Sequence, residues 1–505
     1  MNTNQHNDVK DLVVIGGGIN GCGIARDAAG RGLTVSLFEM GDLAQATSSG
    51  STKLFHGGLR YLEYYEFRLV REALIERERL LTAMPHISWP LRFVLPHHKG
   101  LRPSWLLRLG LFIYDHLGGR KILPATKSLD LSKDKTGKPL KESLKRGFEY
   151  SDCWVDDARL VVLNARDAQD RGASIHTRTR VESAERVSGL WHITVRNLVT
   201  NEQSTVQAKS VINCAGPWVA DVLNNNLNLN SKHGVRLVRG SHIVVKKVYD
   251  HDRAYIFQQS DNRIIFAIPY EDDFTLIGTT DVDHEGPAEK AYCTPEEKEY
   301  LLEAASEYFE KPLKSSDVVW TYSGVRPLYD DNASSATEAT RDYVLKVDSV
   351  NGQAAALNVF GGKITTYRKL AESALKEMEK FHPNMGKPWT AGIALPGGHF
   401  ELGDIEQLLN QIQDKYPFLN ENWAKRLLRT YGTDLFEILG SSNTIEDLGQ
   451  HFGYNLYEAE VNWLKKKEWA QSEEDILWRR TKLGLRLSQD DIDSLNSFLA
   501  KQPSD

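Results

Sequence analysis

The chain has 505 residues, too many for one ordinary hydrophobic core, so we expect two or three domains. Its composition, 41% hydrophobic and 26% charged, is typical of a soluble globular protein, and no apolar run reaches the ~18 residues that a membrane-spanning helix needs. The net charge of -6 argues against a general nucleic-acid binder, so we expect no nucleic-acid partner.

The N-terminus and the cysteines indicate an intracellular chain. Residues 1–10 are polar and lack the apolar core of a secretory signal, so we expect the chain in the cytoplasm or on the cytoplasmic side of the cell membrane. The cysteines are scattered, without a CxxC pair or paired histidines, which argues against a metal, an iron–sulfur cluster or a disulfide framework. We expect them to be reduced and structural.

Near the N-terminus, an apolar strand pattern breaks at Gly16-x-Gly18-x-x-Gly21 into a helical pattern. In a dinucleotide-binding fold the first glycine permits the tight turn, the second lets the backbone approach the pyrophosphate, and the third lets the helix pack on the strand. The next predicted strand ends at Glu39, an acid placed to accept hydrogen bonds from an adenosine ribose. The alternative is an ordinary βα turn whose Glu39 is a solvated strand end.

The rest of the chain returns to this first domain twice. Strand candidates followed by glycine turns occur at 173–217 and again at 355–366. Between them, alternating strands such as 241–245 and 263–268 are typical of an antiparallel sheet. Beyond the Pro-Gly-Gly at 396–398, helical patterns with one apolar face dominate.

Seven runs along the chain are specific enough to indicate a family. They are VVIGGGING at 13–21, KLFHGGLRYL at 53–62, YSDCWVDDAR at 150–159, IGTTD at 277–281, YSGVRPL at 322–328, FGGKITTYR at 360–368 and LWRRTKLG at 477–484. On these runs the chain resembles the FAD-dependent, membrane-associated glycerol-3-phosphate dehydrogenases of the bacterial aerobic type. The resemblance implies oxidation of sn-glycerol 3-phosphate to dihydroxyacetone phosphate, with electrons passed through FAD to a membrane quinone.

Patterns and resemblance together predict an α/β fold with a Rossmann-like FAD-binding domain, an antiparallel-sheet substrate domain and a helical C-terminal domain. We expect a discontinuous FAD-binding domain at 1–85, 150–235 and 346–387, a helical insertion and candidate membrane-facing segment at 86–149, a substrate-binding cap domain at 236–345, and the helical domain at 388–505. We expect no metal. A homodimer stays open.

The substrate carries a phosphate dianion, so its site needs fixed cations, and arginine suits bidentate phosphate recognition. The candidate cations are Arg60, Arg326, Arg341 and Lys363. Three of them lie beside glycines or a proline, where loops present functional groups. Arg341 is equally well explained as a surface ion pair with Asp342. Tyr61 and Thr279 are candidates for neutral hydrogen bonds to the substrate.

Oxidation of the substrate alcohol also requires loss of its hydroxyl proton. His242 is the first candidate for the base, because its ordinary pKa lies close to working pH. The alternatives are a hydrogen-bonded structural histidine or one that binds the substrate phosphate. Arg326 is better suited to polarise the developing carbonyl oxygen, because it stays protonated. We therefore assign Arg326, His242 and Lys363 to the catalytic set.

The resemblance also implies which residues hold FAD, with glycine at positions where the backbone approaches the cofactor closely. The expected cofactor-binding residues are Gly16, Gly18, Asn20, Gly21, Glu39, Ser48, Ser49, Lys53, Leu54, His56, Gly57, Val181, Gly216, Gly362, Lys363 and Thr365. We expect the binding to be noncovalent, although His56 is a candidate linkage site.

The segment 102–114 is the candidate membrane-facing surface, because it combines Trp105, leucines and Phe112 with basic residues. The basic residues in or near it are Arg102, Arg108, Arg120 and Lys121. Basic side chains would meet anionic headgroups while the apolar face enters the interface. The alternative is an amphipathic helix packed on the core of its own protein. The three lysines at 465–467 are a weaker candidate.

Four rival functions remain open at this stage. A flavin oxidase of the same fold would pass its electrons to oxygen, and an amine-oxidising relative would have a different substrate. A non-catalytic protein would keep FAD for structure or sensing. An NAD-dependent dehydrogenase fits the glycine turn but not the later returns to the first domain.

Overall fold

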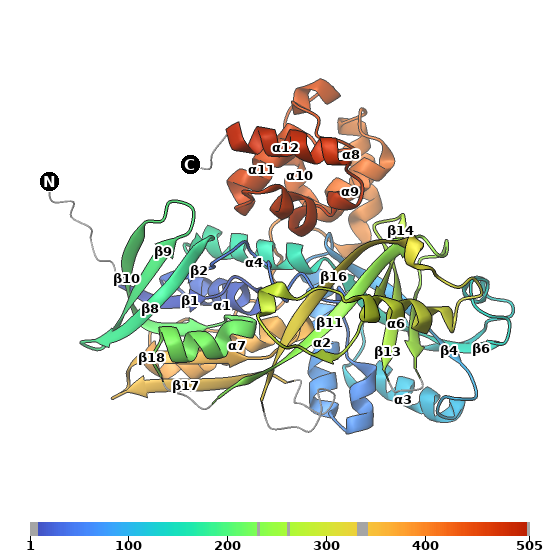
Figure 1. The fold of residues 1–505 in the computed structure, drawn as a ribbon, viewed down its shortest axis with the longest axis horizontal. Coiled ribbons are helices and arrows are strands. Elements are labelled where there is room, and N and C mark those ends of the chain that lie inside the picture. The colour runs from blue at the N-terminus through green and yellow to red at the C-terminus, as the bar shows by residue number, and fades with distance from the viewer. Residues whose placement is uncertain (1–8, 230–232, 260–262, 331–341, 502–505) are drawn as a thin grey trace.

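The computed structural model describes residues 9–229, 233–259, 263–330 and 342–501. Two sheets lie side by side, and a helical domain formed by the C-terminal part of the chain sits above them in Figure 1. This arrangement confirms the predicted α/β fold class. The bounds of the predicted domains stay a prediction.

The first sheet contains the glycine-turn strand at its centre. Its strands are β1 (Lys10–Ile15), β2 (Val35–Phe38), β7 (Ser174–His176), β8 (Thr179–Val187), β9 (Leu190–Asn197), β10 (Gln203–Asn213), β17 (Val344–Val350) and β18 (Gln353–Phe360). The parallel core has the order β18-β10-β1-β2-β7, while β17 pairs antiparallel with β18 and the β8–β9 hairpin extends β10. Three segments of the chain therefore build one sheet.

Alternate residues of β1 face two different cores. Leu12 and Val14 pack in a cluster with α1 (Ile19–Gly30), α4 (Asp157–Asp170) and α7 (Tyr367–Met378), whereas Val13 and Ile15 pack in a cluster with β8 and β9. A strand buried on both faces is apolar at every position, which explains the unbroken run in the sequence.

The second sheet is mostly antiparallel and contains most of the segment predicted as the substrate-binding domain. Its strands are β3 (Leu54–Phe55), β4 (Ser88–His97), β5 (Lys127–Asp130), β6 (Arg146–Val155), β11 (Val235–Lys246), β12 (Ala254–Gln258), β13 (Ile264–Tyr270), β14 (Phe274–Gly278), β15 (Val282–Asp283) and β16 (Val318–Tyr329). Its order is β15-β11-β14-β13-β12-β4-β6-β3, with β16 on β11 and β5 on β6, and its pairs are antiparallel apart from β12 with β4. One face packs on α6 (Pro295–Ser306) and the other on residues of α2 (Phe67–Ala83) and α3 (Ser104–Leu117).

The segment 86–149, which we expected to be a helical insertion, contains strands as well as the helix α3. Its first strand, β4, pairs with β6 from Ser88 to His97 in the interior of the second sheet. Pro90 and Pro96 obscure the strand pattern in the sequence, and the partner strand lies about fifty residues further along the chain.

The C-terminal domain has a hydrophobic core of its own. Its helices are α8 (Ile405–Lys415), α9 (Glu421–Tyr431), α10 (Leu435–Leu439), α11 (Glu458–Glu468) and α12 (Gln489–Lys501), with a π-helical turn, η12 (Asp475–Arg480), before the last of them. This domain confirms the predicted helical character of the C-terminal region.

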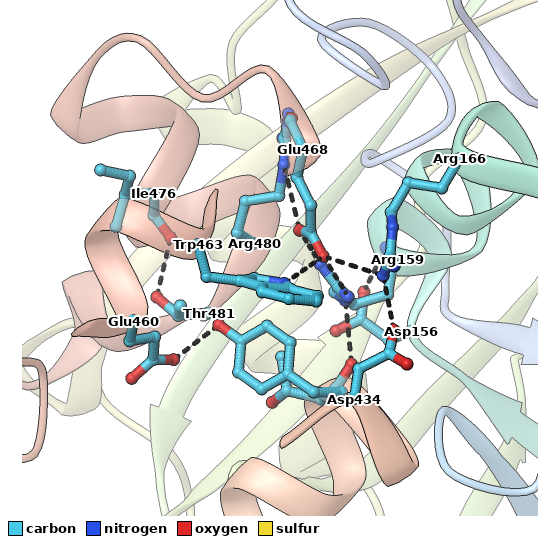
Figure 2. Close-up of polar contacts among 12 residues, drawn as sticks. Asp156, Arg159, Arg166, Asp434, Glu460, Trp463, Glu468, Ile476, Arg480 and Thr481 are labelled. Carbon is cyan, nitrogen blue, oxygen red and sulfur yellow. Dashed lines mark hydrogen bonds and ion pairs between the residues drawn. The ribbon is translucent and has the colours of Figure 1, made fainter. Parts of the chain in front are cut away.

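Buried ion pairs join the C-terminal domain to the first sheet's helices (Figure 2). Arg159 of α4 donates to both carboxylate oxygens of Glu468, and both side chains are fully buried. Arg166, two turns further along α4, pairs with Asp434 at 2.7 Å. Burial alone would raise the pKa of Glu468, but the positive charges of Arg159, Arg166 and Arg480 hold it below its ordinary value.

Removing one partner of the buried Arg159–Glu468 pair should be strongly destabilising, because it leaves a buried guanidinium without its counter-charge. We expect Glu468→Gln to lower the free energy of unfolding by about 3–5 kcal/mol at neutral pH. As a control, Glu437→Gln removes an exposed pair with Lys467 and should cost less than about 1 kcal/mol. Calorimetric melting of the two variants checks this, and equal losses would contradict it.

The same pair predicts a pH dependence. The pKa of Glu468 is lowered in the folded protein, so its ionisation contributes stability that is complete above the unfolded pKa of about 4.3 and is lost as pH falls through the folded value. The difference between the native protein and Glu468→Gln should therefore be constant from pH 7 to about pH 5 and shrink as melting is repeated below about pH 4.3, towards the folded value. A difference that stays constant throughout would exclude the linkage.

Candidate active site

A cavity of about 1560 Å³ lies between the two sheets. The glycine turn, the segment 39–54 and the turn after β18 line one side, whereas β11, β16 and residues after β14 line the other. The cavity is larger than the usual ligand site of about 300–1,000 Å³, so it is large enough for a dinucleotide together with a small substrate.

The glycine turn has the close contacts that the fingerprint requires. A Cβ on Gly21 would lie 1.9 Å from the carbonyl oxygen of Gly16, and a Cβ on Gly16 would lie 2.5 Å from that of Cys214. Gly16 also has a φ of +109°, which favours glycine. Gly18 is the N-cap of α1, and it lines the cavity together with Ile19 and Asn20, so the positive end of the helix dipole lies at the cavity.

Glu39 ties the glycine turn to the segment that follows β2. Its two carboxylate oxygens accept hydrogen bonds from the backbone amides of Gly17 at 2.6 Å and Gly41 at 2.7 Å. A carboxylate has about four acceptor positions, so two remain for ribose hydroxyls. Burial raises the pKa of Glu39 above its ordinary value. The ribose role of Glu39 stays a prediction, and sequence reasoning missed the structural one.

Most of the expected FAD contacts line this cavity. They are Gly16, Gly18, Asn20, Glu39, Ser48, Ser49, Lys53, Leu54, His56, Val181, Gly216, Gly362 and Lys363. Gly21, Gly57 and Thr365 lie outside the lining, and each supports a residue that belongs to it. Thr365 Oγ1, for example, accepts from the amide of His56 at 3.2 Å. Burial, together with the charges of Lys363 and Arg77, lowers the pKa of His56 to about 4.

The ammonium group of Lys53 forms hydrogen bonds with groups of the protein. It donates to Asp157 Oδ1 at 2.8 Å and to the carbonyl oxygen of Ser49 at 3.2 Å, and its side chain is buried. Ser48 Oγ accepts from the amide of Ile19 at 3.0 Å, at the start of α1. These two residues hold the cavity wall in place, whatever they contact in FAD.

Arg326 reaches the cavity from β16. Its Nη1 donates to Asp281 Oδ1 at 2.5 Å and its Nη2 donates to Thr279 Oγ1 at 3.3 Å. Gly240 on the neighbouring strand leaves room for this guanidinium, because a Cβ there would lie 2.5 Å from Arg326 Nη2. The structure therefore brings Arg326 and Thr279 together, as the sequence predicts, and adds Asp281.

His242 lies beside them on β11 and is buried. Its Nε2 is 2.9 Å from Thr52 Oγ1, and its ring stacks on Tyr322 with centroids 4.7 Å apart. Its Nδ1 has no hydrogen-bond partner within the described part of the protein. Burial, with the positive charges of Arg326 and Lys53, lowers the pKa of His242 well below its ordinary value, so the imidazole is neutral at physiological pH.

Lys363, Tyr61 and Arg60 also line the cavity. The Lys363 ammonium lies 3.7 Å from the centroid of the Tyr61 ring. Arg60 is in the short helical turn η1 (Leu59–Tyr64) and donates to Tyr64 Oη at 3.3 Å. Arg341 lies outside the described residues, and Asp342, the partner expected for it, forms an ion pair with Arg68.

Comparisons with known proteins agree with this geometry. The sequence matches the family described as FAD dependent oxidoreductase over residues 11–368, and the C-terminal domain of alpha-glycerophosphate oxidase over residues 388–499. A glycerol-3-phosphate dehydrogenase of Pseudomonas aeruginosa is 52% identical over 98% of this chain and 96% of its own length. A D-erythritol 1-phosphate dehydrogenase of Brucella abortus is 53% identical over 95% of each chain.

Among solved structures, the glycerol-3-phosphate dehydrogenase from Bacillus halodurans complexed with FAD matches with a TM-score of 0.76. It is 27% identical, and the match covers 98% of this chain and 94% of that one. The chain belongs to the family of FAD-dependent glycerol-3-phosphate dehydrogenases. Its cofactor is FAD, and the residues around the glycine turn fit that cofactor, since side chains there would obstruct the approach of a pyrophosphate.

Three residues of this glycerol-3-phosphate dehydrogenase family member were missed by sequence reasoning. Asp281 and Tyr322 lie within the runs IGTTD and YSGVRPL, so the motifs themselves contained the signal. Thr52 had no such signal, because its contact with His242 joins positions 190 residues apart.

The neutral state of His242 predicts how the reaction should respond to pH. Because its pKa is far below 6.5, protonation of His242 should not slow flavin reduction above about pH 6. The native enzyme and His242→Gln should therefore show parallel pH profiles of kcat/KM between pH 6 and 9, although the variant is slower. Titration of the substrate phosphate is common to both and cancels. An acid limb near pH 6.5 that disappears in the variant would contradict the prediction.

Proposed function

We propose that the protein oxidises sn-glycerol 3-phosphate to dihydroxyacetone phosphate, with hydride transfer to FAD and passage of the electrons to a membrane quinone. The observation that carries the proposal is that Arg60, Arg326 and Lys363 line the same cavity as the glycine turn. A site that combines several cations with a flavin suits an alcohol that carries a phosphate.

In this proposal the residues of the chain divide the work of binding and proton transfer. FAD, when bound, accepts the hydride from C2 of the substrate. Arg326, held by Asp281, donates to the C2 oxygen as it becomes a carbonyl oxygen. His242, whose Nε2 is hydrogen-bonded to Thr52, accepts the hydroxyl proton. Lys363 and Arg60 bind the phosphate.

D-Erythritol 1-phosphate is the second candidate substrate, because the relative from Brucella abortus is as similar as the glycerol-3-phosphate dehydrogenase from Pseudomonas aeruginosa. Both compounds are phosphorylated polyols, and the same cations suit both. Oxygen is the second candidate acceptor, since the C-terminal region matches a family named for an oxidase.

Flavin bleaching separates these candidates. Under anaerobic conditions, sn-glycerol 3-phosphate should bleach the flavin absorbance of the purified protein faster than D-erythritol 1-phosphate at equal concentration. A soluble quinone should then restore the absorbance faster than oxygen does. Faster bleaching by the erythritol compound would reassign the substrate, and faster reoxidation by oxygen would make the protein an oxidase.

Arg326→Ala tests the role of the cation beside Thr279. We expect FAD to stay bound while the rate of flavin reduction falls about 100-fold, the scale of a lost charged hydrogen bond in the transition state. Arg236→Ala is the matched control, because Arg236 on the adjacent strand β11 pairs with Asp283 and lies outside the cavity lining. Normal reduction in Arg326→Ala, measured by stopped-flow absorbance, would sink its assigned role.

We also propose that the outer face of α3 lies on the anionic, cytoplasmic surface of the cell membrane and gives access to quinone. Trp105, Leu109 and Phe112 are 67%, 47% and 56% exposed, and Arg108 lies on the same face. The opposite face buries Leu111 and contacts the protein. One face of α3 therefore packs on the protein, while the exposed face is available for the membrane surface that we propose.

The neighbouring turn η1 extends this apolar surface. Tyr64 and Tyr65 are exposed there, and η1 contacts α3 and also lines the cavity through Arg60 and Tyr61. In Figure 1, α3 lies at the edge of the molecule opposite the C-terminal domain. None of the helices in the described ranges is long and apolar enough to cross a bilayer. Exposed aromatic residues with a basic neighbour are typical of interfacial binding.

Vesicle binding tests this surface. The triple variant Trp105→Ser, Arg108→Glu, Phe112→Ser should lose most of its binding to anionic phosphatidylglycerol vesicles in a flotation assay, while bleaching by substrate in solution is unchanged. Val199→Ser, which removes an exposed apolar side chain from the β9–β10 hairpin, should bind as the native protein does. Undiminished binding of the triple variant would place the membrane face elsewhere.

A further inference from the structure

Asp42 belongs to the segment 39–53, which lines the FAD cavity. The cations that pair with its carboxylate come from the C-terminal domain. Asp42 is buried and follows Gly41, whose amide donates to Glu39 at the expected ribose position. Arg480 donates from Nη1 and Nη2 to the two oxygens of Asp42, at 2.9 and 2.8 Å. Arg479 Nε donates to the same carboxylate at 2.6 Å. Paired bonds of this kind fix orientation as well as charge.

The two arginines are themselves fixed by further buried bonds. Arg480 Nη2 also donates to the carbonyl oxygen of Glu468 at 2.6 Å, next to the Arg159–Glu468 pair in Figure 2. Arg479 Nη2 donates to Asp475 at 2.6 Å. Burial alone would raise the pKa of Asp475, but Arg178 and Arg479 lower it to about 2. Asp475 is therefore ionised at neutral pH.

Asp475 of this cluster also connects, through Arg178, to the segment that contains Glu39. Asp475 accepts from Arg178 Nη2 at 2.6 Å, and Arg178 follows β7 in the FAD sheet. The backbone amide of Arg178 donates to the carbonyl oxygen of Gly41 at 2.8 Å, and that of Thr179 donates to Glu39 at 2.8 Å. The stretch from Glu39 to Asp42 is thus held by β7–β8 on one side and by the C-terminal domain on the other.

The C-terminal domain also reaches the cavity directly. Glu474, Trp478, Arg479 and Lys482 line it, together with the segment 39–53. Another interface pair, Arg166 with Asp434, contributes neither residue to the lining. Among the described residues, the interface contacts of Asp42 therefore involve the cavity wall, whereas the Arg166–Asp434 pair does not.

From these contacts we infer that Arg479 and Arg480 are positioning residues for FAD: through Asp42 they hold the ribose-binding loop in its cofactor-bound shape, so that the C-terminal domain controls FAD retention. A loop that is already ordered does not lose conformational entropy when the ligand binds, and this raises affinity without a new contact. Released from the arginines, the buried Asp42 would turn towards water and take Gly41 with it.

FAD affinity of the apoprotein tests the inference. Asp42→Asn should raise the FAD dissociation constant about tenfold or more, measured by quenching of flavin fluorescence on titration of the full-length apoprotein. Arg479→Gln, which leaves Arg480 on Asp42, should raise it less. It is also the milder variant that keeps the test available where Asp42→Asn does not fold.

Asp434→Asn is the matched control, because it breaks the pair with Arg166 in the same interface, away from the cavity, and leaves Arg166 beside Glu468. It should lower the melting temperature of the apoprotein while leaving the FAD dissociation constant within about twofold of the native value. Weaker FAD binding in the Asp42 and Arg479 variants alone supports the positioning role. An unchanged constant in those variants, or an equal rise in Asp434→Asn, would overturn it and leave a purely structural interface.

Discussion

The segment 39–53, between β2 and β3, is the constraint on which the rest of the site depends. It bonds to each of the three parts of the protein. Glu39 and Ser48 bond to backbone amides of the glycine turn and the first residue of α1. Thr47 and Ser51 bond to β16, and Thr52 bonds to His242. Asp42 bonds to the C-terminal domain. A cavity wall with so many distant anchors has one conformation only when all three parts are folded and docked.

The glycines let these parts approach closely enough for such bonds to form. Gly50 and Gly324 lie back to back, so a Cβ on Gly324 would be 2.9 Å from the carbonyl oxygen of Gly50. Asn20 Nδ2 donates to the carbonyl oxygen of Gly361, which joins the first glycine turn to the turn after β18. Carboxyl ends of parallel strands meet at one edge of a sheet, and ligands bind there. Glycines at these contacts thus allow the first sheet and its turns to lie close to strand β16 of the second sheet.

Sequence reasoning identified the parts that local pattern encodes. The glycine turn, the buried strands, the alternating strands and the helical end of the chain each have a period or a turn signal within a few residues. Most of the expected FAD and substrate residues line one cavity because they lie in turns that follow predicted strands. The strands at 86–149 and the bonds from Arg479 and Arg480 to Asp42 had no such signal. Asp42 meets Arg480 across 438 positions, and a pairing at that separation leaves no periodicity in the sequence.

The ion pair between Arg326 and Asp281 helps to divide the proposed roles among the cations. Asp281 is 2.5 Å from Arg326 Nη1, so much of the positive charge of this guanidinium is already offset. A cation offset in this way is a weak counter-ion for a phosphate dianion, but it is a well-oriented hydrogen-bond donor to a single developing oxygen. Lys363 lies over the face of Tyr61, and the quadrupole of the ring attracts an ammonium group. The electrostatics therefore favour Arg326 at the reacting C2 oxygen and Lys363 at the phosphate, with neutral His242 between the guanidinium and the wall segment as the proton acceptor.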